Sequence, residues 1–461
     1  MSKYEEPCDG RLSSTVPREG RGETPLHLLD HILPMARTDT TFSGNPFYTG
    51  NDIPPQFFCD RRNETEMLIR YMKDGSNVVL KSPRRIGKSS LIKHVLRQKE
   101  VLSGFNTLYV DIYGTRDAGE FHDEFQRKLL SAPFAKDEKF RKGLDALLKS
   151  AYLQFAGYNG LTGDFKLLDL GFRPSSVPRI PLDELFAFLE STDRPNIVVF
   201  DEFQQIEYYP EKMAAILRSY VQGMNNTRFI FSGSSSHMLT TMFQLSNQPF
   251  YKSAVSMDLD IIPQESYREY CMRMFALGNK QITPEAVDFV YCLFSGDSFL
   301  MQQIMKQAYS SVSVGETADK ATVWNALEDL LKTKDADFRD ILSRITSPVE
   351  RNLLYCVASK GVASGLTSSL TIRKYNLESA SAVQHALSNL TDEEFGLIAK
   401  VSKATYVIKD RLFELWLADR GGYLGWYKDS AEERFEKQRK LETSLPDPFI
   451  PGKEVADSDG E

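Results

Sequence analysis

The sequence is poor in the residues that build disulfide frameworks and metal clusters. It has five cysteines and six histidines in 461 residues, and no two cysteines form a Cys-x-x-Cys pair. Scattered cysteines in odd number argue against a disulfide framework or a zinc site. They are Cys8, Cys59, Cys271, Cys292 and Cys356. We therefore expect reduced thiols in a cytoplasmic protein.

Long hydrophobic runs and an excess of positive charge are also missing. No stretch approaches the roughly 18 uninterrupted apolar residues of a membrane helix, and the N-terminal region has no apolar signal segment. The formal net charge is −7. This excludes a basic surface over the whole protein, while a local basic patch stays open. We expect a soluble protein with no membrane partner, and the length predicts two to three domains.

One segment has the pattern of a phosphate-binding loop. Residues 78–80 are an apolar strand, and an apolar helix with Leu91 and Val95 begins after Gly-Lys-Ser. This strand–loop–helix context is what a nucleotide-binding P-loop requires, although a Gly-Lys-Ser tripeptide alone also occurs in surface turns. We expect nucleotide contacts along the loop, at Ser82, Pro83, Arg84, Arg85, Ile86, Gly87, Lys88, Ser89 and Ser90.

Three residues of the loop have specific expected roles. Gly87 allows the backbone to approach phosphate closely, Lys88 supplies a positive charge, and the Ser89 hydroxyl is placed to ligate Mg²⁺. The first position of the loop, normally glycine, is Ser82. Serine adopts a positive φ less readily than glycine, so Ser82 leaves the tightness of the loop entry open.

A second strand ends in two carboxylates. The apolar residues 197–200 are typical of a strand buried on both faces of a parallel sheet, and Asp201 and Glu202 follow directly. Ligands of open α/β sheets bind at the carboxyl ends of the strands. We assign Asp201 to the Mg²⁺ shell and Glu202 to the general base that orients water. The alternative is a buried strand that ends in a solvated acidic turn.

Two further strands are expected at residues 107–112 and 227–231. Ser234 follows the second of them and is a candidate contact to the γ-phosphate, with a simple Ser/Gly turn as an equal alternative. Asp111, near the end of the first, more simply caps or turns the chain.

These motifs together resemble the archaeal-type ATPase family, whose members are AAA+-like P-loop proteins related to STAND ATPases. The similarity covers roughly residues 45 to 420. It implies a P-loop ATPase core, a helical lid, a C-terminal winged helix and a preference for adenine. Ser82 departs from the consensus of the loop. The matching segments are Asn45-Pro46-Phe47, Ile53-Pro54-Pro55-Gln56-Phe57-Phe58-Cys59-Asp60-Arg61-Arg62, Ser82-Pro83-Arg84-Arg85-Ile86-Gly87-Lys88-Ser89, Asp201-Glu202-Phe203-Gln204, Phe231-Ser232-Gly233-Ser234-Ser235 and Pro249-Phe250-Tyr251-Lys252-Ser253-Ala254.

The expected fold is α/β: a P-loop NTPase parallel-sheet core with a helical lid and a C-terminal winged-helix domain. We expect a disordered N-terminal tail at 1–41, the ATPase core at 42–250, the lid at 251–340, the winged helix at 341–425 and an acidic tail at 426–461. Met35 is an alternative translation start. Helices are predicted at 63–72, 121–151, 182–189, 210–223, 263–275, 284–294, 299–312 and 322–332, and a short strand at 165–168.

The winged helix is predicted from a helix at 348–360, a second at 379–390 and a hairpin of two strands at 397–401 and 405–408. The second helix contains no Arg or Lys, so contact with a protein is at least as well supported as contact with DNA. Residues available for DNA are Arg373, Lys374, Gln384, His385, Lys400 and Lys403.

The sequence therefore predicts a switch that binds ATP and Mg²⁺, hydrolyses ATP and couples nucleotide state to a partner through the winged helix. The alternative is a DNA- or protein-binding module whose nucleotide pocket does not turn over. Arg218 and Arg228 are candidates for an arginine finger in a homo-oligomer, with a solvated or ion-paired role as the simpler interpretation. Lys252 is a further candidate for phosphate contact, and a surface role is simpler.

Overall fold

The computed structural model describes residues 42, 44–50, 52–136, 138–156, 179–392 and 396–444. Its centre is a five-stranded, fully parallel sheet of order β2-β3-β4-β1-β5. The strands are β1 (Val78–Lys81), β2 (Asn106–Asp111), β3 (Asn196–Asp201), β4 (Thr227–Gly233) and β5 (Val255–Asp258). Residues from Phe42 onward belong to one compact unit.

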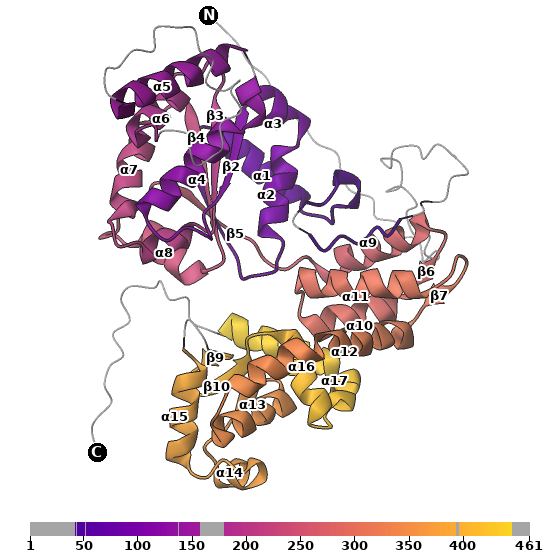
Figure 1. Ribbon diagram of the computed structural model, residues 1–461. Helices are drawn as coiled ribbons and strands as arrows, with labels where there is room; N and C mark the ends of the chain where they lie inside the picture. The colour runs from indigo at the N-terminus through magenta and orange to yellow at the C-terminus, as the bar shows by residue number, and fades with distance from the viewer. Residues whose placement is uncertain are drawn as a thin grey trace, which may run out of the picture. The chain divides into compact units, whose positions relative to one another are not determined.

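Helices cover both faces of the sheet (Figure 1), as a parallel sheet requires. One face packs against α1 (Arg62–Lys73), α2 (Lys88–Leu96) and α3 (Lys99–Gly104). The other packs against α4 (Ala118–Leu130), α5 (Glu138–Ala156), α6 (Leu182–Glu190), α7 (Met213–Gly223) and α8 (Ser236–Gln244). Alternate residues of each strand point to opposite faces, so Phe200 joins the second layer while Val199 joins the first.

Four helices form the segment expected to be a lid. They are α9 (Gln264–Leu277), α10 (Pro284–Phe294), α11 (Ser298–Ser311) and α12 (Lys320–Arg344), with β6 (Gln281–Ile282) and β7 (Thr317–Ala318) pairing beside them. Side chains cap three helix starts: Thr283, Asp297 and Asp319 accept hydrogen bonds from backbone N–H groups of α10, α11 and α12. Such caps satisfy donors that the first turn leaves unpaired.

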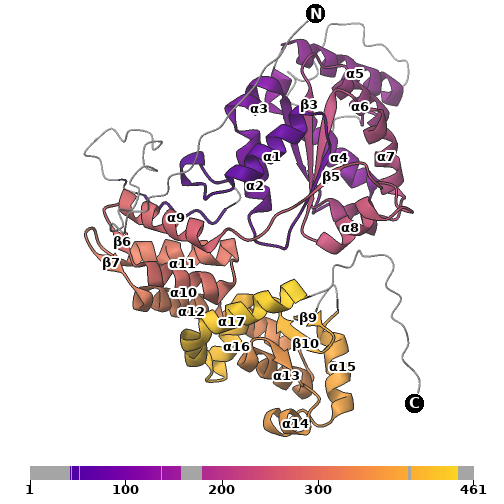
Figure 2. The ribbon, with the colours of Figure 1, turned by 180° about the vertical axis from the view of Figure 1, so that it is seen from behind.

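The C-terminal segment has the winged-helix arrangement. Its helices are α13 (Pro348–Lys360), α14 (Ser369–Tyr375), α15 (Ala380–Leu390) and α16 (Arg411–Arg420). The strands β8 (Ala363–Ser364), β10 (Thr405–Ile408) and β9 (Ile398–Ser402) form an antiparallel sheet in that order. The view from behind in Figure 2 shows this sheet beside α13 and α15. The predicted α/β fold with a C-terminal winged helix is confirmed.

Three expectations about elements are wrong. The predicted helix at 121–151 is two helices, α4 and α5, because Pro133 interrupts the helical hydrogen bonding and starts a short 3-10 turn. The lid does not begin at residue 251, because β5 pairs in parallel with β1 and belongs to the sheet. The segment from residue 426 is not all tail: α17 (Leu424–Ser444) is a helix whose Tyr427 is buried.

The other predicted domain bounds stay predictions, and so does the alternative start at Met35. The expected tail at 1–41, the strand at 165–168 and the last part of the acidic tail lie outside the described residues. In the part of the chain that the structure describes, we find no helix both long and apolar enough for a membrane span.

Candidate nucleotide-binding site

The loop between β1 and α2 has the backbone shape of a phosphate cradle. Gly87 is the residue before α2 and has φ +92°, and no atom lies within 4 Å of the position that a Cβ would take there. The N-terminus of α2 therefore opens onto free space, where backbone N–H groups and the helix dipole favour an anion. Arg85 also has a positive φ, whereas Ser82 does not. The serine at the first position therefore does not require a left-handed conformation.

Lys88 is the first residue of α2 and is only 6% exposed. The pKa of Lys88 is lowered, mainly because the side chain is buried. The carboxylates of Glu202 and Asp201 act in the opposite direction, and Arg84 adds to the lowering. Solvent screens this buried ammonium group only weakly, so it interacts strongly with the two carboxylates and with any anion that enters the loop.

Asp201 collects hydrogen bonds from three elements. Its Oδ2 accepts from Ser89 Oγ at 2.6 Å and from the hydroxyl of Tyr109 on β2, and its Oδ1 accepts from Ser232 Oγ at 2.7 Å. Asp201 is 2% exposed and lies at the end of β3. The bond to Ser89 puts the two predicted Mg²⁺ ligands in contact.

The oxygens of Ser89 and Asp201 fit the preferences of Mg²⁺, which binds proteins through one or two carboxylates and takes its remaining ligands from phosphate and water. Among the described residues, no group of three or more His, Cys, Asp or Glu side chains is placed to hold a metal ion.

Glu202 has an unusual backbone for its position. Its φ of 57° and ψ of 42° are left-handed, a conformation that costs free energy for a residue with a Cβ and that is often found at functional sites. Its Oε2 accepts from Ser234 Oγ at 2.8 Å and from Gln204 Nε2 at 2.5 Å. Gly233 makes room for this arrangement, since a Cβ there would come within 2.0 Å of Gln204 Oε1.

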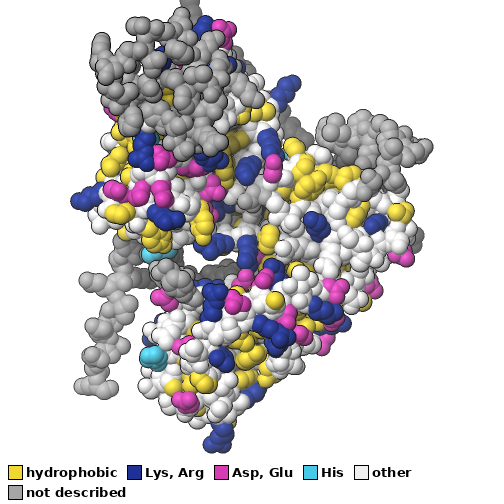
Figure 3. Space-filling view, in the orientation of Figure 1, with side chains coloured by type: hydrophobic (Ala, Val, Ile, Leu, Met, Phe, Trp, Pro, Cys, Tyr) yellow, Lys and Arg dark blue, Asp and Glu magenta, His cyan; other side chains and the backbone are white. Residues whose placement is uncertain are grey.

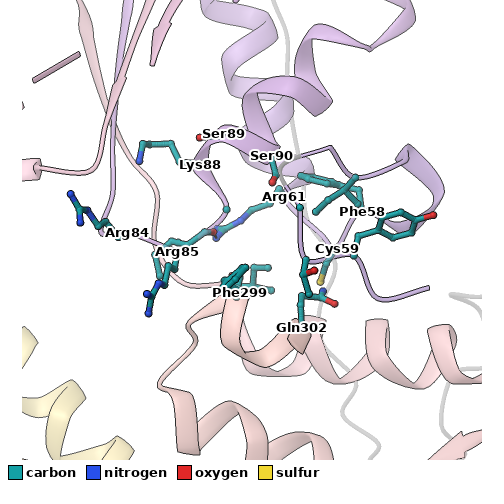
Figure 4. Close-up of a pocket in the computed structure, with 18 of the residues that line it drawn as sticks. Phe58, Cys59, Arg61, Arg84, Arg85, Lys88, Ser89, Ser90, Phe299 and Gln302 are labelled. Carbon is teal, nitrogen blue, oxygen red and sulfur yellow. The ribbon is translucent and has the colours of Figure 1, made fainter. Parts of the chain in front are cut away.

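A cavity of about 450 Å³ adjoins these groups. Of the predicted nucleotide residues, Arg84 to Ser90, Asp201, Glu202 and Ser234 line it, and Ser82 and Pro83 do not. Asp111, which we expected only to cap or turn the chain, also lines it. Figure 4 shows Lys88 and Ser89 on the loop side and Phe299 and Gln302 rising from the helix below. The apolar end is lined by side chains that we did not predict: Tyr48, Ile53, Phe57, Phe58, Cys59, Ile262 and Phe299.

Three predicted cations lie elsewhere. Arg218 and Arg228 do not line the cavity, and Arg228 donates to the backbone oxygen of Asn225. The ammonium group of Lys252 lies 5.1 Å from the centre of the Tyr251 ring and also lies outside the lining.

Arg85 connects the loop to two other helices. Its Nη2 donates to Asp410 Oδ2 at 3.0 Å, and its Nη1 lies 3.9 Å from Asp297 Oδ2. Asp410 caps α16 of the winged helix and Asp297 caps α11. Burial raises the pKa of Asp297 to about 6, although Arg85 acts to lower it.

Sequence reasoning missed Tyr109 and Gln204. The register of β2 with β3 pairs Asp111 with Asp201 and Tyr109 with Val199. Alternate residues of a strand share a face, so Tyr109 and Asp111 point to the same side of the sheet as Val199 and Asp201. The two-residue spacing of Tyr109 and Asp111 in the sequence could therefore have identified Tyr109. Gln204 follows Glu202 by two residues, and only the 3-10 turn Phe203–Tyr208 brings its amide back to the carboxylate.

A parallel sheet of order β2-β3-β4-β1-β5, with a glycine–lysine–serine loop after β1 and an acidic end on β3, defines a P-loop nucleotide-binding fold. Together with the winged helix, this is the fold of AAA+-like ATPases, as the resemblance to the archaeal-type ATPase family predicts.

Comparisons with known proteins agree with this fold. A family model described as "Probable winged helix domain" matches residues 336–419. The chain is similar to a Walker-type ATPase of Pyrococcus abyssi, with a TM-score of 0.52 and 18% identity over 80% of this chain and 99% of the other. No curated protein matches the sequence.

Two solved structures from Aeropyrum pernix also match. The ORC2 protein in its ADPNP–ADP complexes gives a TM-score of 0.47 and 14% identity over 82% of this chain and 95% of the other. The ORC1 protein in complex with DNA gives 0.43 and 12% over 83% and 96%.

Proposed function

We propose that this protein is an ATP-hydrolysing, AAA+-like switch. The observation that carries the proposal is the convergence of Lys88, Ser89, Asp201 and Glu202 on one cavity. These residue types are the minimum that phosphoryl transfer to water requires: charge for the phosphates, oxygen ligands for a metal, and a carboxylate for the nucleophile.

In this mechanism the loop and the end of β3 bind the phosphates and the metal. The loop amides and Lys88 bind the β- and γ-phosphates, and Ser89 and Asp201 hold Mg²⁺. When bound, Mg²⁺ neutralises charge that develops on the phosphates. Tyr109 and Ser232 fix the orientation of the Asp201 carboxylate through their hydrogen bonds.

Glu202 acts on the water. Its carboxylate lines the cavity and is oriented by Ser234 and Gln204, so it can accept a proton from a water aligned with the terminal phosphate. Ser234 is thus at once a partner of the base and a neighbour of the phosphate position.

The contacts of Arg85 support a coupling role. The same side chain lines the cavity and forms an ion pair with Asp410 at the start of α16. A phosphate in the cavity would compete with Asp410 for this guanidinium, so nucleotide occupancy would bias the winged helix. In a homo-oligomer, Arg218 or Arg228 is available to a neighbouring site.

The test of the enzymatic assignment is Glu202→Gln. The amide keeps the size of the side chain and removes the base, so we expect ATP affinity to be retained and turnover to fall by about 10²–10⁴-fold. Steady-state phosphate release and equilibrium binding of ATP measure the two properties. Glu207→Gln, at an exposed position on the same 3-10 turn, is the matched control. Undiminished hydrolysis by Glu202→Gln would contradict the assignment.

A second function, binding of DNA without turnover, has one observation in its favour. The six predicted contact residues are all exposed, on α14, α15, β9 and the turn that follows β9: Arg373, Lys374, Gln384, His385, Lys400 and Lys403. Figure 3, however, shows basic and acidic side chains interspersed over the face in view. DNA affinity that falls steeply with salt, in a protein that does not hydrolyse ATP, would favour this function, and no DNA binding at low salt would reject it.

A further inference from the structure

Two polar side chains from the first turns of α11 line the cavity. Ser298 and Gln302 are four residues apart, so they lie on one face of the helix, and both line the cavity. Gln302 is only 9% exposed. Figure 4 shows it rising from the helix toward the region below the loop, near Phe299 and Cys59.

A chain of hydrogen bonds fixes the orientation of the Gln302 amide. The hydroxyl of Tyr270 donates to the backbone oxygen of Phe57 at 3.1 Å, an atom that can only accept. The Tyr270 oxygen is therefore left as an acceptor for Gln302, whose Nε2 donates to it at 3.3 Å. The Nε2 end is held on Tyr270, and the Oε1 end is directed away from it.

The Oε1 atom of Gln302 is buried and has no hydrogen-bond partner, and the same is true of Ser298 Oγ. Buried polar atoms in folded proteins are normally paired, because an unpaired one loses its hydration without compensation. Ser298 and Gln302 both line the cavity, so a ligand bound there would be placed to supply the missing partners.

The surroundings indicate a flat, mostly apolar ligand group with polar edges. Phe57, Phe58 and Ile262 line the same cavity as the phosphate-binding groups. Phe299 also lines it and lies beside the loop, with its ring centre 5.9 Å from the Arg85 guanidinium. Phe58 is fixed by stacking on His94, with ring centroids 4.0 Å apart and planes 7° from parallel. A nucleotide bound through its phosphates at Lys88 would extend its base toward this wall.

We propose that Gln302 determines base specificity, with its Oε1 accepting a hydrogen bond from the 6-amino group of adenine. Ser298, which can donate or accept, contacts an adjacent ring nitrogen. This inference rests on the proposed function and adds to it a side chain that selects the base. A base with a carbonyl oxygen at position 6 would bring two acceptors together at Gln302 and would be disfavoured.

The test compares three nucleotides that differ at position 6, of which the inosine nucleotide also carries a hydrogen on the adjacent ring nitrogen N1. ATP carries the 6-amino group, purine riboside triphosphate carries hydrogen, and inosine triphosphate carries oxygen. Equilibrium affinities are measured with Mg²⁺ in the full chain carrying Glu202→Gln, so that the ligands are not consumed. We expect ATP to bind at least about tenfold more tightly than either analogue.

Gln302→Met removes the acceptor at nearly constant size, and we expect it to reduce the preference for ATP over purine riboside triphosphate to about twofold or less. Gln303→Met, at the next residue and outside the cavity lining, keeps the preference. The comparison of nucleotides in the parent protein tests the inference even if Gln302→Met does not fold.

If ATP and purine riboside triphosphate bind with equal affinity and binding still depends on Lys88, the role of Gln302 is overturned while the proposed function stands. A preference that survives Gln302→Met would do the same. Failure of all three nucleotides to bind would overturn the proposed function, and this inference with it.

Discussion

Asp297 shows how a single buried carboxylate makes the stability of this protein depend on pH. It caps α11 and faces Arg85 on the loop and Asp410 on α16. Burial raises its pKa from 3.8 to about 6. The folded state therefore holds the proton more tightly than the unfolded state, and unfolding free energy is lost as the pH rises from about 4 to about 6.

We predict that Asp297→Asn removes this loss. Asparagine also caps helices and carries no charge, so the variant gains on the order of 2 kcal/mol relative to the wild type between pH 4.5 and 7.5. Urea unfolding of both proteins across that range measures the difference. Parallel stability curves would contradict the raised pKa.

At the residue scale, site residues that lie within a continuous sequence motif could be predicted. Site residues that come from a distant helix could not. Lys88 and Ser89 begin α2 directly after the loop, and Asp201 and Glu202 lie at the end of β3. Gln302 comes from a helix more than 200 residues after the loop, and its role depends on the Tyr270–Phe57 pair that orients its amide. No spacing in the sequence encodes that contact.

At the scale of elements, the ion pair between Arg85 and Asp410 joins the loop to α16. We predict that Asp410→Asn, which retains the capping ability of the side chain, raises ATP affinity by about two- to fivefold, because Arg85 no longer has to leave a charged partner. Binding of ATP to both proteins at low and physiological salt measures the effect.

Asp419→Asn, an exposed position on the same helix, is the control and leaves the affinity unchanged. Equal ATP affinity in Asp410→Asn and wild type would show that the ion pair does not compete with phosphate.

Strands and helices with a clear hydrophobic pattern in their own sequence were predicted. Elements that form through pairing or packing with distant segments were not. β3 is an unbroken apolar run, and its bounds match the prediction within a residue. β5 has only one fully buried residue of four, Met257, so it has little hydrophobic signal and forms through pairing with β1. α17 reads as a charged tail, yet Arg434 is buried against Glu414 and the Tyr427 ring.

At the scale of the whole molecule, the order of the motifs predicts the fold class, since a P-loop, an acidic strand end and a winged helix follow one another along the chain. The contacts between these parts were not predictable. Arg85 and Asp410 are 325 residues apart, and Phe57 and Tyr270 are 213 apart. Such pairs depend on how whole helices and strands pack against one another. The hydrophobic periodicity of a single element gives no information about that packing.

Steady-state ATP hydrolysis with Mg²⁺, measured for the wild type and for Lys88→Ala, shows most directly whether this cavity is an ATPase site. Lys88 is the buried charge next to the loop, so we predict turnover in the wild type and a loss of at least about a hundredfold in the variant. Equal turnover in both proteins, or none in the wild type while ATP still binds, would contradict the assignment of this cavity as an ATPase site.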